Sequence, residues 1–182
     1  MLWTNSVQYR VTVRWSDLFG DIEGQFESRQ NAEFLAGVDE LTAAERASVE
    51  LAARLAAAMS RSVVLHLDMG VAVEGTIMDA TPSWVLLREG PRDHLVPLNA
   101  VVGVTGLPDR SIPVGAIERK LTLGHALRAL QGERTKVMVE APGVRFRGVI
   151  AAVGADHVDV LEDSGRGRVA VPFRAISRVM SV

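Results

Sequence analysis

Short runs in which apolar and polar residues alternate follow one another along most of the chain. The first, Tyr9–Trp15, has an apolar residue at every second position, which predicts a half-buried strand. Five further apolar runs lie between residues 62 and 104, separated by turn sequences such as DMG and GPRD. The pattern therefore predicts five strands here, at 63–67, 71–77, 84–87, 94–97 and 101–104.

The second half of the chain repeats this pattern. The turn glycines Gly70 and Gly143 are 73 residues apart, and so are Gly75 and Gly148. The phrases VPLNAVVGV, from residue 96, and VPFRAISRV, from residue 171, close the two copies. We interpret the recurrence as an internal duplication. Its second copy predicts strands at 136–140, 144–150, 157–161, 168–171 and 176–179.

A helix is predicted before the first strand of each copy. Leu41–Met59 has one apolar face, and Thr42 and Glu45 have the spacing of a capping box. Leu123–Leu130 follows Thr122, a good N-cap residue, and Gly132 is placed to end that helix. A shorter helix is predicted near Ser16–Phe26, after the N-terminal strand.

The glycines and prolines inside the strand pattern predict how the strands are arranged. Gly75 and Gly148 stand in the middle of the second strands, where a sheet can bend sharply. Pro97 and Pro172 cannot donate to a ladder, so they should end the fourth strands. Five short strands that curl strongly can close and remove their edges. We therefore predict an α+β fold with two tandem five-stranded SH3-like barrels, each preceded by a helix, plus the N-terminal strand and short helix.

We expect strand four of one barrel to lie beside strand five of the other. The predictions also divide the chain into four segments. They are an N-terminal extension (1–40), a helix with the first barrel (41–107), a linker (108–120) and a helix with the second barrel (121–182).

The stretch LHLDMGVAVEGTIMDATPSWVLLRE, followed by LVPLNAVVGV, resembles the Sm-like family, and most nearly its bacterial Hfq-type pattern. VPFRAISRV resembles the closing phrase of that pattern. The resemblance implies two Sm-like barrels and an RNA ligand. In Hfq-type proteins the three positions between Val and Ala are an aromatic residue, Lys and His, which contact uridine-rich RNA. Here they are Pro-Leu-Asn at 97–99 and Pro-Phe-Arg at 172–174, so Arg174 alone keeps a positive charge.

Composition places the protein among globular chains. Of the 182 residues, 48% are hydrophobic and 23% charged, which is enough to bury a core. The absence of cysteine excludes disulfides, zinc–thiolate sites and a cysteine nucleophile. The N-terminus lacks the pattern of a secretion signal, and the apolar run Leu51–Met59 is too short to span a bilayer. We expect a cytoplasmic protein without a membrane partner.

Charge is distributed unevenly along the chain. The net charge is −2, but residues 1–60 carry −4 and residues 117–182 carry +4. The acidic first part could dock on the basic last part, within one chain or between chains, or the basic part could meet an anionic partner.

Six arginines are the candidate nucleic-acid-binding residues. Arg145 and Arg147 flank Phe146, so on a strand both side chains point to the same face. Four others could extend that face into a phosphate-binding surface: Arg166, Arg168, Arg174 and Arg178. The alternatives are a solvated face or contact with an acidic protein surface, such as residues 17–27 of another chain. Trp84 could stack on a base, but its apolar strand favours a core position.

No sequence motif indicates an enzyme or a cofactor. The four histidines are scattered without ligand spacing, and Asp156-His157 is explained by hydrogen bonds to the local backbone. An acidic run could bind a metal, but it lacks the spacing of a calcium loop: Asp17, Asp21, Glu23 and Glu27. We expect no metal site. Two functions stay open: a non-catalytic Sm-like protein that binds RNA, or a structural protein-interaction module without a nucleic-acid ligand. Either is expected as a homo-oligomer or as a pseudo-dimer of barrels within the chain.

Overall fold

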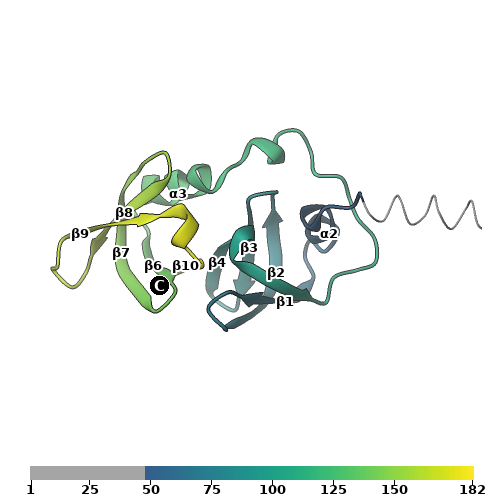
Figure 1. Cartoon of the computed structure of the whole chain (residues 1–182), viewed down its shortest axis with the longest axis horizontal. Helices are drawn as coiled ribbons and strands as arrows, with labels where there is room; N and C mark the ends of the chain where they lie inside the picture. The colour runs from purple at the N-terminus through teal and green to yellow at the C-terminus, as the bar shows by residue number, and fades with distance from the viewer. Residues whose placement is uncertain (1–47) are drawn as a thin grey trace, which may run out of the picture. The chain divides into compact units, whose positions relative to one another are not determined.

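The computed structural model describes residues 48–182 (Figure 1). Three predictions lie outside these residues: the strand at 9–15, the short helix near 16–26 and the first part of the helix at 41–59. The acidic residues at 17–27 lie outside them as well.

Within the described residues the strands form one sheet. It has ten antiparallel strands in the order β5-β1-β2-β3-β4-β10-β6-β7-β8-β9. The strands of the first half are β1 (Ser62–Leu67), β2 (Ala72–Ala80), β3 (Trp84–Glu89), β4 (Arg92–Pro97) and β5 (Val101–Thr105). Those of the second half are β6 (Lys136–Ala141), β7 (Val144–Val153), β8 (His157–Glu162), β9 (Arg168–Pro172) and β10 (Arg178–Ser181).

The prediction of two tandem five-stranded barrels is wrong, because the sheet is continuous and open. β4 of the first half pairs with β10 of the second, with Leu95 opposite Val179 and His94 opposite Met180. This pairing satisfies backbone groups that each half would otherwise satisfy by closing on itself. The prediction that strand four of one half lies beside strand five of the other is confirmed. We call this β4–β10 contact the joint.

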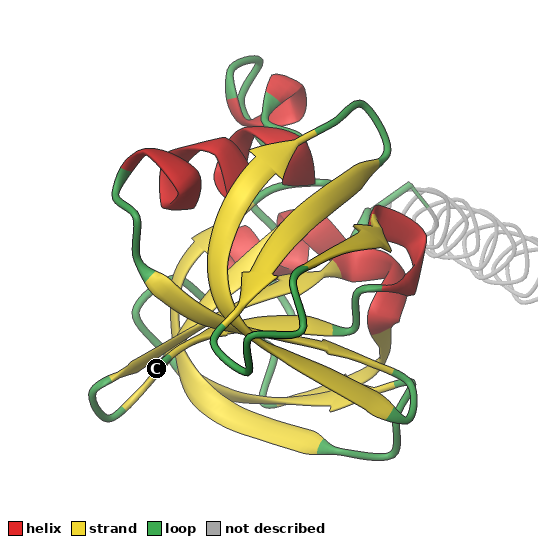
Figure 2. Cartoon of the chain, turned by 90° about the vertical axis from the view of Figure 1, so that its left-hand side faces the viewer, coloured by secondary structure: helices red, strands yellow, loops and turns green. Residues whose placement is uncertain are grey.

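The two halves nevertheless follow the same plan. Each has the strand order fifth, first, second, third, fourth. Gly75 faces Val63 on the first strand of its half, and Gly148 faces Val137 at the equivalent place. A Cβ on Gly75 would lie 2.8 Å from the carbonyl oxygen of Arg88, and one on Gly148 would overlap that of Leu161. Both glycines therefore allow the close approach of the third strand, and Figure 2 shows how strongly the long strands curve.

Helices are few in the described part of the chain. α2 (Leu51–Ala57) is shorter than predicted, since residues 48–50 are not helical and Ser60 has a φ of 62°. α3 (Leu123–Gly132) has Thr122 as its N-cap and ends at Gly132, both as predicted. Three short 3-10 helices complete the set: η1 (Leu98–Ala100), η2 (Glu118–Lys120) and η3 (Phe173–Ala175). None of these helices is long and apolar enough to cross a membrane.

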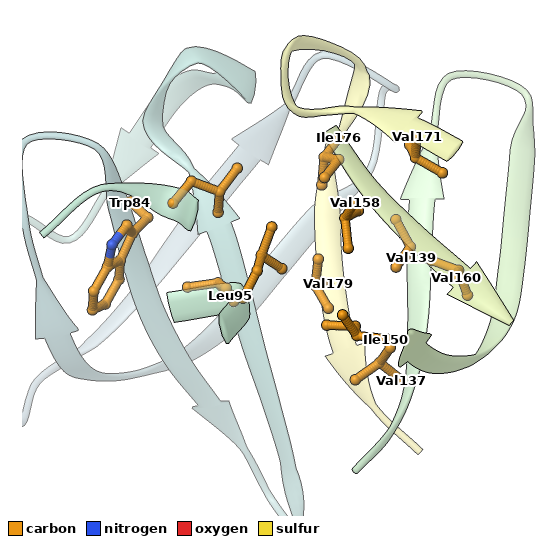
Figure 3. Packing of buried hydrophobic residues seen from close by; sticks show 12 residues of the cluster. Trp84, Leu95, Val137, Val139, Ile150, Val158, Val160, Val171, Ile176 and Val179 are labelled. Carbon is orange, nitrogen blue, oxygen red and sulfur yellow. The ribbon is translucent and has the colours of Figure 1, made fainter. Parts of the chain in front are cut away.

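Two apolar clusters form the core, and one of them crosses the joint. The crossing cluster packs Trp84 and Leu95 of the first half with residues of the second half, including Val179 (Figure 3). Leu127 of α3 is fully buried in it. Trp84 is only 6% exposed, so the prediction of a core position is confirmed for this residue. The joint is therefore held by apolar packing as well as by backbone pairing.

Candidate functional site

The six candidate arginines lie on different elements of the second half. They are divided among three strands, one turn and one 3-10 helix: β7 (Arg145, Arg147), β9 (Arg168), β10 (Arg178), the β8–β9 turn (Arg166) and η3 (Arg174). Five of them are exposed, whereas Arg178 is mostly covered.

Two of these arginines hold one buried carboxylate. Arg178, Glu140 and Arg145 stand opposite one another on β10, β6 and β7. Arg178 donates from Nε (2.9 Å) and Nη2 (2.6 Å) to Oε2 of Glu140, and Arg145 Nε lies 3.1 Å from Oε1. The Glu140 side chain is only 2% exposed, and a buried charge is tolerated only when it is paired. Arg145 and Arg178 thus have a structural role in neutralising Glu140.

Two more arginines pair with carboxylates on the surface. Arg147 and Lys136 lie 3.8 and 3.1 Å from Oδ2 of Asp163. Arg168 lies 3.6 Å from Oδ2 of Asp159 on the neighbouring strand. Such exposed pairs add little to stability, but they lower the positive potential that a phosphate would meet.

Arg166 and Arg174 form no ion pair with any residue from 48 to 182. They lie on different elements, the β8–β9 turn and η3. The structure therefore does not bring the six arginines together as one unpaired basic surface.

A pocket brings together the two closing phrases of the repeat. It has a volume of about 410 Å³ and is lined by η1, η3 and the start of α3. Asn99 comes from the first phrase, and Phe173 and Arg174 come from the second. These are the positions at which the Hfq-type resemblance implies RNA contacts.

His94 is a buried ionisable residue at the joint that the sequence did not single out. Its side chain is 1% exposed, and neither ring nitrogen has a hydrogen-bond partner among the described residues. Nε2 lies 3.0 Å from Oε2 of Glu89, a close contact without hydrogen-bond geometry. Burial lowers the pKa of His94, Arg178 and Arg92 lower it further, and Glu89 opposes them. One signal in the sequence indicated this burial. The residue that corresponds to His94 in the second half, 75 positions later, is the apolar Val169.

The depressed pKa of His94 predicts that the protein loses stability in mild acid. In the unfolded chain the residue titrates near pH 6.5, so below that pH the unfolded state binds a proton that the native state resists. The free energy of unfolding in urea should therefore fall between about pH 7 and about pH 5. His94→Val, which copies the second half, should reduce this fall. An unchanged pH profile in the variant would contradict the assignment to His94.

His157 differs from His94 because it is exposed and paired. Its Nδ1 lies 2.9 Å from Oδ1 of Asp156, and this contact raises the pKa of His157 and lowers that of Asp156. The predicted backbone hydrogen bonds are present, since Gly154 N–H donates to the His157 carbonyl oxygen and Phe173 N–H to that of Asp156. The contact of the ring with the adjacent carboxylate was not predicted.

Polar contacts across the joint were also missed. The Ser177 hydroxyl donates to Oδ1 of Asp68 at 2.8 Å, and the Asp93 backbone N–H donates to Oγ of Ser181 at 2.9 Å. Both contacts join residues of different halves, so no local sequence signal could have indicated them.

An apolar pocket of about 490 Å³ lies beside α3 at the joint. Trp84, Leu95 and Val179 are among its lining residues. Its two ionisable groups are engaged elsewhere: Asp93 pairs with Arg88 at 2.7 Å, and His125 caps α3 through Thr122. This arrangement offers apolar surface rather than groups poised for proton transfer.

Comparison of the chain with models of known protein families and with curated protein sequences gives no match. The likeness to the Sm-like family therefore stays a prediction from the sequence motifs.

Proposed function

We propose that this protein is a non-catalytic structural module of the cytoplasm that binds protein through the edges of its sheet and has no nucleic-acid ligand. The observation that supports this best is that four of the six candidate arginines contact carboxylates of their own half, namely Glu140, Asp163 and Asp159. Arginines that a carboxylate already contacts attract phosphates less strongly than unpaired ones.

The argument against phosphate binding is strongest for Arg145 and Arg178, because both contact the buried carboxylate of Glu140. If either guanidinium turned to a phosphate, Glu140 would lose a partner while it is 2% exposed. Leaving a buried carboxylate short of a partner costs several kcal/mol, about as much as several phosphate contacts return. These two residues are therefore poor candidates for a nucleic-acid site.

The sheet edges support the proposal that the protein binds another protein. β5 and β9 stand at the two ends of the strand order, so no described strand covers their outer sides. An uncovered edge presents backbone N–H and C=O groups that another strand can pair with. Val102 on β5 is 70% exposed, and contact with a partner would remove this apolar side chain from water.

Filter binding of uridine-rich single-stranded RNA to the full chain tests the proposal. We expect no binding that depends steeply on salt between about 50 and about 200 mM. Binding that weakens several hundredfold or more over that range would show multiple phosphate contacts and would overturn the proposal.

RNA binding is the second candidate function, and the pocket with Asn99, Phe173 and Arg174 favours it. Arg174 forms no ion pair with residues 48–182, and the ring of Phe173 beside it is one on which a base could stack. If RNA binds, Arg174→Gln should weaken it about tenfold or more, whereas Arg166→Gln is the matched control. Equal effects of the two variants would point to unspecific charge and not to this pocket.

A further inference from the structure

We propose that the apolar pocket beside α3 binds a neutral small molecule that carries a hydrogen-bond acceptor, such as the carbonyl oxygen of an amide or a ketone. This site is separate from the edges of the sheet and goes beyond the proposed function. Three features support it: the apolar walls of the pocket, a buried donor without a partner, and the segment that fills the corresponding place in the first half.

The pocket is built at the joint from both halves of the chain. Trp84 and Leu95 line it from the first half, and Val137 and Val179 line it from the second (Figure 3). α3 contributes small side chains such as that of Ala129. The volume of about 490 Å³ lies in the range of small-molecule sites, about 300 to 1,000 Å³. Apolar walls of this kind are typical of such sites, because they remove the apolar part of a ligand from water.

Trp84 supplies a polar group that needs a partner. The residue is 6% exposed, and its indole Nε1 forms no hydrogen bond with any residue from 48 to 182. Most buried polar groups are bonded, and an unpaired donor in the interior is costly. A ligand acceptor beside Trp84 removes that cost once the indole turns slightly toward it, since Nε1 is closed to solvent. The pocket therefore prefers a carbonyl compound to a plain hydrocarbon.

The ionisable groups around the pocket favour a neutral ligand. Asp93 is held by Arg88 at 2.7 Å, and its backbone N–H donates to Oγ of Ser181. Nδ1 of His125 lies 2.9 Å from Oγ1 of Thr122 in the cap of α3. Because these groups are engaged with each other, a charged ligand would lose its hydration in the pocket without gaining a counterion.

The first half shows which chemistry fits between the helix and the end of the fifth strand. There the chain after β5 runs along α2, and Leu107 packs against the apolar core. The Pro108 carbonyl oxygen accepts a hydrogen bond from Nη2 of Arg54 on α2 at 3.1 Å. In the second half the corresponding place is the pocket, which Met180 and Ser181 line at the end of β10. An apolar group next to a carbonyl oxygen thus occupies this place in one half, and a ligand of the same chemistry fits it in the other.

Fluorescence titration with prodan, a neutral naphthyl ketone, tests the proposal. As the full chain is raised to about 200 µM, prodan at about 1 µM should bind saturably and its emission should shift to the blue. Ala129→Phe fills the pocket from α3 and should weaken binding about tenfold or more. Ala170→Phe is the matched control, because Ala170 is also exposed but lies on β9, away from the pocket. It should leave the dissociation constant unchanged.

Trp84→Phe tests the hydrogen bond itself. The variant keeps an aromatic ring in the wall but removes the N–H, so prodan should bind about three- to tenfold more weakly. The emission of bound prodan should move further to the blue, because its carbonyl loses a donor. Naphthalene, which has no acceptor, should bind the wild type and Trp84→Phe with similar dissociation constants.

Absence of saturable prodan binding would overturn the proposal. Binding that Ala129→Phe and Ala170→Phe weaken equally would overturn it as well, since the probe would then lie elsewhere. If Trp84→Phe binds prodan as tightly as the wild type does, Trp84 is not the donor and the preference for a carbonyl is wrong. None of these results concerns RNA or the sheet edges, so the proposed function is tested separately.

Discussion

Arg178→Met should destabilise the protein by about 3 kcal/mol, the largest single effect that we expect outside the apolar core. The variant keeps the length of the side chain but leaves Glu140, which is 2% exposed, with only the longer contact to Arg145. A buried carboxylate that loses its closest partner is poorly compensated. Urea unfolding followed by circular dichroism measures the change.

Two further variants separate this effect from a general loss of charge. Arg168→Met removes an exposed pair with Asp159 and should cost less than about 1 kcal/mol. Adding Glu140→Leu to Arg178→Met removes the unpaired carboxylate and should recover most of the loss. If Arg178→Met and Arg168→Met cost the same, the carboxylate of Glu140 is not buried in solution as described.

Gly148→Ala should destabilise the protein by about 1–3 kcal/mol, by forcing two strands apart. A Cβ at this position overlaps the Leu161 carbonyl oxygen, which is backbone and cannot turn aside. The equivalent change Gly75→Ala should act in the same direction with a smaller effect, since its Cβ would lie 2.8 Å from the Arg88 carbonyl oxygen. The unfolding midpoint in urea gives both values.

Gly132→Ala is the matched control for the two glycine variants. Gly132 is the last residue of α3, and a Cβ there meets no atom within 4 Å. Alanine also favours helix over glycine, so stability should be unchanged or slightly higher. A loss at Gly132 equal to that at Gly148 would mean that the close approach of β8 to β7 is not the cause.

The strands could be predicted from the sequence because their signals are local. Alternation along each run and the glycines and prolines between runs place all ten described strands within a few residues. The repeat was equally visible, since Gly75 and Gly148 occupy equivalent places. Whether each half closes into a barrel was not predictable. The backbone groups at a strand edge can pair equally well with a strand of the same half or with one of the other half. The pairing of Leu95 with Val179 settles that choice, and these residues are 84 positions apart.

The candidate site was predictable only as a set of residue types. The sequence places Arg145 and Arg147 on one face of a strand. The pairing of β6 with β7 is consistent with this placement. It does not show that Glu140 is buried between Arg145 and Arg178, because that requires β10 to pair with β6. His94 was missed for a similar reason: it is buried by β10, which comes some 80 residues later in the chain.

Sedimentation of the full chain mixed with uridine-rich RNA tests most directly whether this protein has a nucleic-acid ligand. With protein between about 5 and 200 µM at moderate salt, both species are followed in one experiment. We predict that the RNA sediments by itself at every protein concentration, because four of the six candidate arginines contact carboxylates of their own half. Protein that carries the RNA with it would contradict the account.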